Sequence, residues 1–179
     1  IAAAAALTTG NEAAQRLALT GAVVEMVAHG LITGALFLIA GAFWQRGQEY
    51  DLGAYGGLAR VGPRLTGFTI LAAFASLGLP GLAAFVAEFQ VFVGTFAVYP
   101  WLAAVALLGL LITAALFLQI VQELFFGELP PRWAHFPDLR GVELAVLSAL
   151  LLLVVVIGIY PRWLLAVIDG ASSVVVGGG

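Results

Sequence analysis

The sequence ASLGLPGLAAFVAEF, residues 75–89, interrupts the most apolar part of this chain and ends in a carboxylate. Pro80 lacks a backbone donor, and the flanking Gly78 and Gly81 weaken a helix further. The apolar tract around it, residues 65–98, would reach about 50 Å as one straight helix, against a hydrocarbon layer of about 30 Å. The pattern therefore predicts two short helices that meet at this break, with the loosened backbone shielded by protein.

The composition assigns the chain to the membrane. Of its 179 residues, 63% are hydrophobic and only 9% are charged, whereas about a quarter is typical of a soluble domain. No soluble core of this size hides so much apolar surface, so lipid must be the solvent for most of it. The sequence contains no lysine and no basic patch, which argues against nucleic acid as a partner. We expect an all-α integral membrane protein, a bundle of transmembrane helices with a break near Gly78–Gly81.

Hydrophobic runs and turn residues divide the chain into segments. The N-terminus has no Met and no basic n-region, and it resembles the tail of a longer helix rather than a signal peptide. We therefore expect the C-terminal piece of something larger. The predicted segments are a truncated helix end with a loop (1–16), a span (17–44), a polar loop (45–64), the broken tract (65–98), a long helix (100–126), a membrane-edge loop (127–141), a last span (142–160) and a surface helix (164–176).

The charges do not decide the orientation at this point. Arginines lie in both long loops, residues 45–64 and 127–141. If the broken tract makes two crossings, these loops face opposite sides, and the positive-inside rule then favours neither.

Glu88 is the strongest candidate for function. Between Arg64 and Glu123 it is the only ionisable side chain besides Tyr99. Ionisable residues inside a membrane are costly, and they commonly mark ion or proton pathways. Desolvation raises a carboxyl pKa and a nearby cation lowers it, so a group balanced between the two can exchange a proton near neutral pH. The alternative is a carboxylate at the membrane edge with no special role.

Glu25 and His29 form a second candidate group. Spaced i, i+4 on the first span, they share one helix face and can touch. The imidazole titrates near neutrality and suits a proton relay, although a structural polar pair that holds helices together is the alternative. Small residues on the same span (Gly21, Gly30, Gly34 and Gly41) predict a neighbouring helix packed closely against it.

Two further polar residues carry weaker signals. Glu123 lies near the end of the helix that begins at Pro100, where it reaches either the interface or a proton exit path. His135 lies in a loop between Arg132 and Asp138 and is expected at the surface. With no cysteine and two separated histidines, we expect no metal site and no cofactor in this chain. No nucleotide-binding or hydrolase motif is present.

Several stretches carry a family resemblance through their order and spacing. They are VEMVAHGL (24–31) with GALFL (34–38), DL (51–52) with YGGLA (55–59), ASLGLPG (75–81) leading to FVAEF (85–89), and FFG (125–127). Together they resemble the antiporter-like membrane subunits of respiratory complex I, the proton-translocating NADH:quinone oxidoreductase. The resemblance is closest to subunit M, the counterpart of mitochondrial NADH dehydrogenase subunit 4.

The resemblance implies a fourteen-helix bundle with two inverted five-helix repeats, each holding a half-channel. This chain would supply the end of helix nine and helices ten to fourteen, and the first repeat is missing. Residues 17–127 would be the second half-channel repeat, and residues 128–179 a loop, the final helix and an interfacial tail. Glu88 matches the carboxylate that terminates the second half-channel, where the sister subunit L carries a lysine. His29 matches the histidine of the central polar axis, whereas relatives often have an uncharged polar residue in place of Glu25.

The functional hypothesis that follows is a proton-translocating membrane subunit of a bacterial inner membrane complex. Its partners would be the other membrane subunits, especially neighbouring antiporter-like ones, and the lipid bilayer. NADH, FMN, iron–sulfur clusters and quinone would bind in other subunits. A subunit of a multisubunit cation/proton antiporter is the alternative, and a scaffold without a transport role is a third.

Overall fold

The computed structural model describes residues 11–177, with side chains as far as residue 171. Within this range the chain forms helices and short 3₁₀ turns and no strand, as expected. The helices are α2 (Glu12–Gly47), α3 (Pro63–Ser76), α4 (Ala83–Phe96), α5 (Pro100–Phe125), α6 (Gly141–Ile159) and α7 (Arg162–Gly177), with 3₁₀ turns at Leu52–Ala54, Leu58–Arg60 and Pro131–Trp133. Three of these helices, α2, α5 and α6, are long and apolar enough to cross a membrane. The helix end expected at the N-terminus lies outside the described residues.

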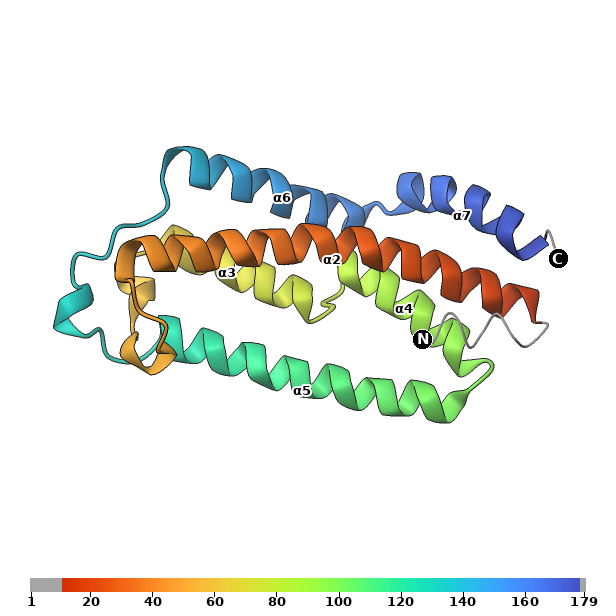
Figure 1. The fold of residues 1–179 in the computed structure, drawn as a ribbon, viewed down its shortest axis with the longest axis horizontal. Coiled ribbons are helices and arrows are strands. Elements are labelled where there is room, and N and C mark those ends of the chain that lie inside the picture. The colour runs from red at the N-terminus through yellow and green to blue at the C-terminus, as the bar shows by residue number, and fades with distance from the viewer. Residues whose placement is uncertain (1–10, 178–179) are drawn as a thin grey trace.

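Helix α2 is longer than the sequence predicted. It begins at Glu12 rather than near Leu17, because the side chain of Asn11 accepts a hydrogen bond from the Ala14 amide at 3.2 Å and so caps the helix. It ends at Gly47, where Gln48 adopts a left-handed conformation with φ 47°. At 1.5 Å per residue its 36 residues extend about 54 Å, and α2 runs along nearly the whole molecule (Figure 1).

The predicted break in the apolar tract is present. Helix α3 ends at Ser76 and α4 begins at Ala83. Between them Gly78 and Gly81 have φ values of +63° and +93°, which L side chains rarely adopt. Yet α4 continues in the direction of α3, so the two helices form one interrupted pass along the bundle (Figure 1). The possibility of two crossings was therefore wrong, because the intervening turn displaces the chain without reversing it.

Protein shields the broken backbone, as expected. Gly158 of α6 faces the break so closely that a Cβ added there would collide with the carbonyl of Gly81 and the Cα of Leu82. Only a residue without a side chain allows this approach. Helix α6 therefore covers the break with its own backbone, which agrees with the rule that irregular backbone at membrane depth is enclosed by protein.

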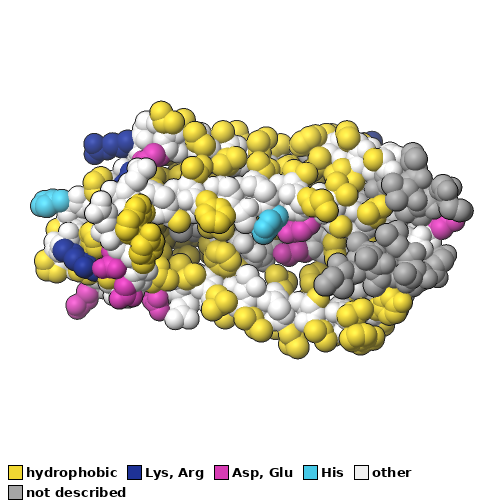
Figure 2. Space-filling model, viewed as in Figure 1, with side chains coloured by type: hydrophobic (Ala, Val, Ile, Leu, Met, Phe, Trp, Pro, Cys, Tyr) yellow, Lys and Arg dark blue, Asp and Glu magenta, His cyan; other side chains and the backbone are white. Residues whose placement is uncertain are grey.

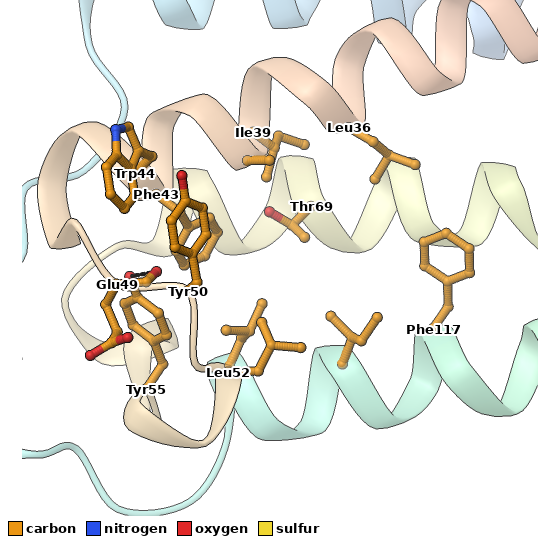
Figure 3. Close-up of a pocket in the computed structure, with 13 residues that line it drawn as sticks. Leu36, Ile39, Phe43, Trp44, Glu49, Tyr50, Leu52, Tyr55, Thr69 and Phe117 are labelled. Carbon is orange, nitrogen blue, oxygen red and sulfur yellow. Dashed lines mark hydrogen bonds between the residues drawn. The ribbon is translucent and has the colours of Figure 1, made fainter.

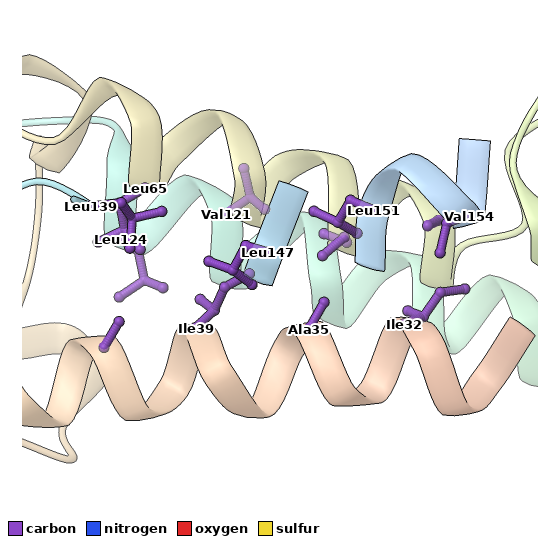
Figure 4. Packing of buried hydrophobic residues seen from close by; sticks show 14 of the residues in the cluster. Ile32, Ala35, Ile39, Leu65, Val121, Leu124, Leu139, Leu147, Leu151 and Val154 are labelled. Atoms are coloured by element: carbon purple, nitrogen blue, oxygen red, sulfur yellow. The ribbon is translucent and has the colours of Figure 1, made fainter. Parts of the chain in front are cut away.

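The core lies between α2, α3, α5 and α6 (Figure 4). One face of α2 presents Ile32, Ala35 and Ile39, which are almost fully buried, and α6 presents Leu147 and Leu151 toward them. A smaller buried cluster joins α2 to two further helices through Val24 of α2, Ala87 of α4 and Ile168 of α7. Because lipid is as apolar as leucine, close packing rather than escape from solvent holds such helices together.

The expected surface helix also packs against the bundle. It forms α7, which continues beyond α6 and lies along the N-terminal half of α2 (Figure 1). The hydroxyl of Thr20 on α2 donates a hydrogen bond of 2.9 Å to the carboxylate of Asp169 on α7.

Two charged residues join the loops at one end of the bundle. The Asp138 carboxylate accepts hydrogen bonds from the amides of Arg64 (3.0 Å) and Leu65 (2.8 Å) and so caps α3, whose own N-cap residue has no side chain. The Arg46 guanidinium donates two hydrogen bonds to the Glu143 carboxylate, at 2.5 and 2.9 Å. These contacts connect α2, α3, α6 and the loop before α6.

Both long loops lie at this same end, which we call the loop end (Figure 1). Five of the seven arginines belong to it (Arg46, Arg60, Arg64, Arg132 and Arg140), and Arg16 and Arg162 lie toward the other end. Most dark blue side chains on the face drawn in Figure 2 are accordingly at that end. The arginine distribution is therefore asymmetric, a point that the sequence alone left undecided because two crossings of residues 65–98 were possible.

Candidate functional site

Glu88 lies inside the bundle, on the second turn of α4. Its side chain is half-buried and its carboxylate contacts Gly78, so that a Cβ added to Gly78 would collide with Oε2. In a helix the side chains lean toward the N-terminus, which for α4 is the break. Eight residues, about 12 Å of helix, separate Glu88 from the end of α4 at Phe96. The carboxylate therefore lies beside the break and not at the far end of α4.

Glu25 links the other two candidates electrostatically. It lies one turn before His29 on α2, and its charge interacts with His29 and with Glu88 on α4. One carboxylate oxygen, Oε2, is buried and has no hydrogen-bond partner among the described residues. Figure 2 shows a histidine beside acidic side chains midway along α2, whereas the other histidine lies at the loop end. The structure therefore gathers Glu25, His29 and Glu88 in one region.

Close packing of α2 against α4 brings these side chains together. A Cβ at Gly21 of α2 would lie 2.9 Å from the backbone nitrogen of Val91. A Cβ at Gly94 of α4 would lie 2.9 Å from the backbone nitrogen of Ala18. The two helices therefore approach at two points through residues without side chains. Glu25 and Glu88 lie about one helical turn beyond the contact between Gly21 and Val91, on the side away from Gly94.

The other three glycines of this predicted contact face of α2 have no helix packed against them in the described chain. Nothing in the described chain lies within 4 Å of a Cβ placed at Gly30, Gly34 or Gly41. Of the glycines expected to admit a neighbouring helix, only Gly21 does so here. His29 is likewise exposed on this face. The spacing identified a face of small and polar residues correctly, but no helix among residues 11–177 covers it.

Glu123 and His135 lie away from this group. Glu123 is exposed on the last turn of α5 and accepts a hydrogen bond of 2.9 Å from the Gln119 side chain. That turn is at the loop end, on the other side of the break from Glu88 (Figure 1). His135 is exposed in the loop before α6. No described contact connects either residue with the central group.

A separate cavity of about 340 Å³ opens near the loop end (Figure 3). Aromatic side chains and Glu49 line it at the loop end, and aliphatic side chains line it toward Phe117. The ring of Tyr55 stacks on Trp133 with centroids 5.0 Å apart. Burial raises the pKa of the Tyr55 hydroxyl, the Glu49 carboxylate adds to the rise, and Arg132 opposes it. Glu88 does not line this cavity, which is therefore not part of the candidate site.

The described residues offer no grouping for a metal ion. No three side chains of His, Asp or Glu between residues 11 and 177 lie close enough to hold one. The central group itself consists of two carboxyl side chains and one imidazole, side-chain types that can exchange protons.

Comparison with known families identifies the chain. Residues 2–113 match the family model described as the transmembrane region of NADH:quinone oxidoreductase and Mrp antiporters. The chain belongs to this family. The matched range contains all of α2, α3 and α4, including Glu25, His29 and Glu88.

Curated relatives within the family are similar over most of the chain. NADH-quinone oxidoreductase subunit M of Mycobacterium tuberculosis is 37% identical over 152 residues, which is 85% of this chain and 28% of the relative. The protein of the same name from Rhodobacter capsulatus is 34% identical over 156 residues, 87% of this chain and 30% of the relative. The chain thus spans less than a third of the length of these family members.

Solved structures agree with the fold. Respiratory complex I from Thermus thermophilus contains a chain that superposes with a TM-score of 0.82 at 31% identity, covering 89% of this chain and 34% of that one. The Mrp complex from Dietzia superposes with a TM-score of 0.78 at 23% identity, covering 89% of this chain and 38% of that one. The second likeness supports the fold alone.

Sequence reasoning missed two residues that hold the bundle together, one of them beside the break. A lone glycine in the apolar last span, Gly158, was a usable signal, because small residues mark close helix contacts. Asp138 had no such signal, because it caps α3 from a loop more than seventy residues away. Two stretches that carry the family resemblance also touch: the amide of Gly57 donates to the carbonyl of Phe126 at 3.0 Å.

Proposed function

We propose that this chain forms a proton half-channel in the membrane part of NADH:quinone oxidoreductase, with Glu88 as the group that takes up and releases the proton. The observation that carries this proposal is the location of the Glu88 carboxylate, half-buried against the break in a discontinuous helix. In transporters, ion sites recur at discontinuous helices, because half-helix ends present unpaired backbone groups there.

The neighbours of Glu88 explain how its proton affinity can change. In a medium of low dielectric constant, a unit charge a few ångströms away acts far more strongly than it does in water. The carboxylate of Glu25 interacts electrostatically with Glu88, and it also interacts with His29. A change in the protonation of either Glu25 or His29 therefore alters the free energy of the charged form of Glu88. The proton path that we propose runs past His29 and Glu25 to Glu88.

The rest of the complex would supply the energy. NADH, FMN, iron–sulfur clusters and quinone would bind in other subunits, and redox chemistry there would change the electrostatic environment of Glu88. The partners of this chain would be neighbouring antiporter-like subunits in a bacterial inner membrane. The arginines support an orientation with the loop end in the cytoplasm, because the positive-inside rule favours the side richer in Lys and Arg.

A cation/proton antiporter subunit is the second candidate. The family description names both NADH:quinone oxidoreductase and Mrp antiporters, and this supports the antiporter subunit as an alternative. The curated relatives above 30% identity are named for the oxidoreductase, and we therefore prefer that function.

The deciding experiment replaces Glu88 by Gln in the assembled complex and measures proton pumping in membrane vesicles. Glutamine keeps the size of the side chain and removes its exchangeable proton, so pumping and the quinone reduction coupled to it should fall to a small fraction. Glu123→Gln is the matched control, because Glu123 is exposed, and it should retain pumping. Normal pumping by Glu88→Gln would refute the proposal and leave the scaffold interpretation. Sodium-dependent exchange without redox subunits would favour the antiporter.

A further inference from the structure

We propose that Gly78 is a positioning residue for Glu88: the missing side chain at residue 78 leaves the space that the Glu88 carboxylate occupies. The proposal rests on the proposed function of Glu88 and assigns part of its geometry to a named residue. The helix break and the carboxylate then form one structural unit, rather than two features that happen to be adjacent.

The contacts around residue 78 carry this inference. All three atoms nearest to a Cβ placed there belong to Glu88, namely Oε2, Cδ at 2.7 Å and Oε1 at 3.1 Å. Real Cβ atoms essentially never approach another atom within 3.0 Å, so any side chain at residue 78 would have to displace the carboxylate. The atoms nearest to the position that glycine leaves empty therefore all belong to the carboxylate to which the function is assigned.

The competing explanation is that Gly78 is present only for its backbone conformation. Its φ of +63° is unfavourable for residues with a Cβ. Gly81 separates the two explanations, because its φ is +93° and nothing in the described chain lies within 4 Å of its Cβ position. Alanine at residue 81 would strain the backbone without reaching Glu88. Alanine at residue 78 would do both.

A displaced carboxylate would also change its electrostatic surroundings. Helices α2, α3, α5 and α6 pack against α4, and the charge among the described residues that acts on Glu88 is that of Glu25 on α2. His29 acts on Glu25 in turn. Moving the Glu88 carboxylate away from Gly78 changes its distance from Glu25, and therefore the pH at which the site takes up a proton.

The first test is the pH profile of proton pumping in the assembled complex. Gly78→Ala should shift the midpoint of the profile by about half a pH unit or more, because carboxyl groups in proteins respond on this scale to a moved charge. Gly81→Ala should lower thermal stability and leave the midpoint in place. Equal midpoints for both variants and the unmodified complex would overturn the proposal.

The second test is a double-mutant cycle in thermal stability, which does not require pumping. Removing the Glu88 side chain removes the collision, so Gly78→Ala should cost less stability in a Glu88→Ala background than alone. Where Gly78→Ala alone fails to assemble, Gly78→Ala with Glu88→Asp should restore assembly, because the shorter side chain withdraws from residue 78. Additive costs, or no recovery, would overturn the proposal. The cycle also separates the role of Gly78 from the proposed function of Glu88. Its result depends on the contact between the two residues and not on whether Glu88→Gln abolishes pumping.

Discussion

Replacing Gly158 by alanine should weaken the bundle, although alanine is the better helix former. Gly158 lies within α6, where the backbone is already helical. Alanine is favoured over glycine in a helix interior by about 1 kcal/mol, so propensity alone predicts a more stable protein. The position of Gly158 against the break reverses this expectation.

The magnitude follows from what the new methyl group meets. Its nearest atoms would be the carbonyl carbon and oxygen of Gly81 and the Cα of Leu82, all of them backbone. A side chain can rotate away from a collision, but backbone in a constrained turn cannot, so α6 must move away from the break. Overpacking of this kind costs about 1–3 kcal/mol. We place this case at about 3 kcal/mol, which leaves a net loss of about 2 kcal/mol after the gain in propensity.

The assay compares thermal stability in detergent with a matched control. The solubilised complex is heated in steps, and the fraction that remains assembled is measured by size-exclusion chromatography. The control is Gly109→Ala in α5, because that glycine is also helical and a Cβ there meets nothing in the described chain within 4 Å. Gly109→Ala should be at least as stable as the unmodified protein. If Gly158→Ala matches it, α6 does not cover the break and the packing argument is wrong.

Three further predictions concern the loop end. Arg46→Gln should lower the stability of the complex by about 1 kcal/mol, because it leaves Glu143 without its ion pair at a partly exposed site. Glu143→Gln should cost less, since a hydrogen bond to Arg46 can persist. Equal losses of stability for the two variants in the same heating assay would argue against the ion pair. Asp138→Ala should cost about 0.5–2 kcal/mol through the lost cap of α3, with Asp138→Asn milder, and an unchanged melting profile would contradict the cap. His135→Cys should react with an impermeant maleimide only from the cytoplasmic side, and Arg162→Cys only from the opposite side, if the loop end faces the cytoplasm. This chain has no cysteine of its own, so each label reports a single position in it. The opposite labelling would reverse the proposed orientation.

The break was predictable from the sequence because its cause is local. Proline lacks a backbone donor and glycine weakens a helix, and both effects act within a few residues. The Gly78, Pro80 and Gly81 combination therefore predicts the break without any knowledge of the tertiary structure. The direction in which α4 leaves the break was not predictable. Hydrophobicity and length allow either a reversal or a continuation, and the packing of α6 against the break is a contact between distant parts of the chain.

In the candidate site, too, local features were predictable from the sequence, whereas contacts between distant segments were not. Glu25 and His29 were predicted to share a face because helical spacing requires it. Their relation to Glu88 depends on how closely α2 and α4 pack, and the sequence does not say which glycine faces which helix. Gly21 meets α4, whereas Gly30 and Gly34 meet nothing in the described chain. Spacing along a helix thus identifies which residues share a face and leaves open what lies opposite.

The interrupted pass has a consequence for how such a segment can be inherited. Because α3 and α4 together count once, the passes of α2, α3 with α4, α5 and α6 alternate in direction, and the polypeptide returns to the side from which α2 started (Figure 1). The helices from α2 to α6 therefore make an even number of passes and form a topologically neutral unit. A gene fusion or duplication could gain or lose it without inverting the membrane orientation of anything encoded downstream.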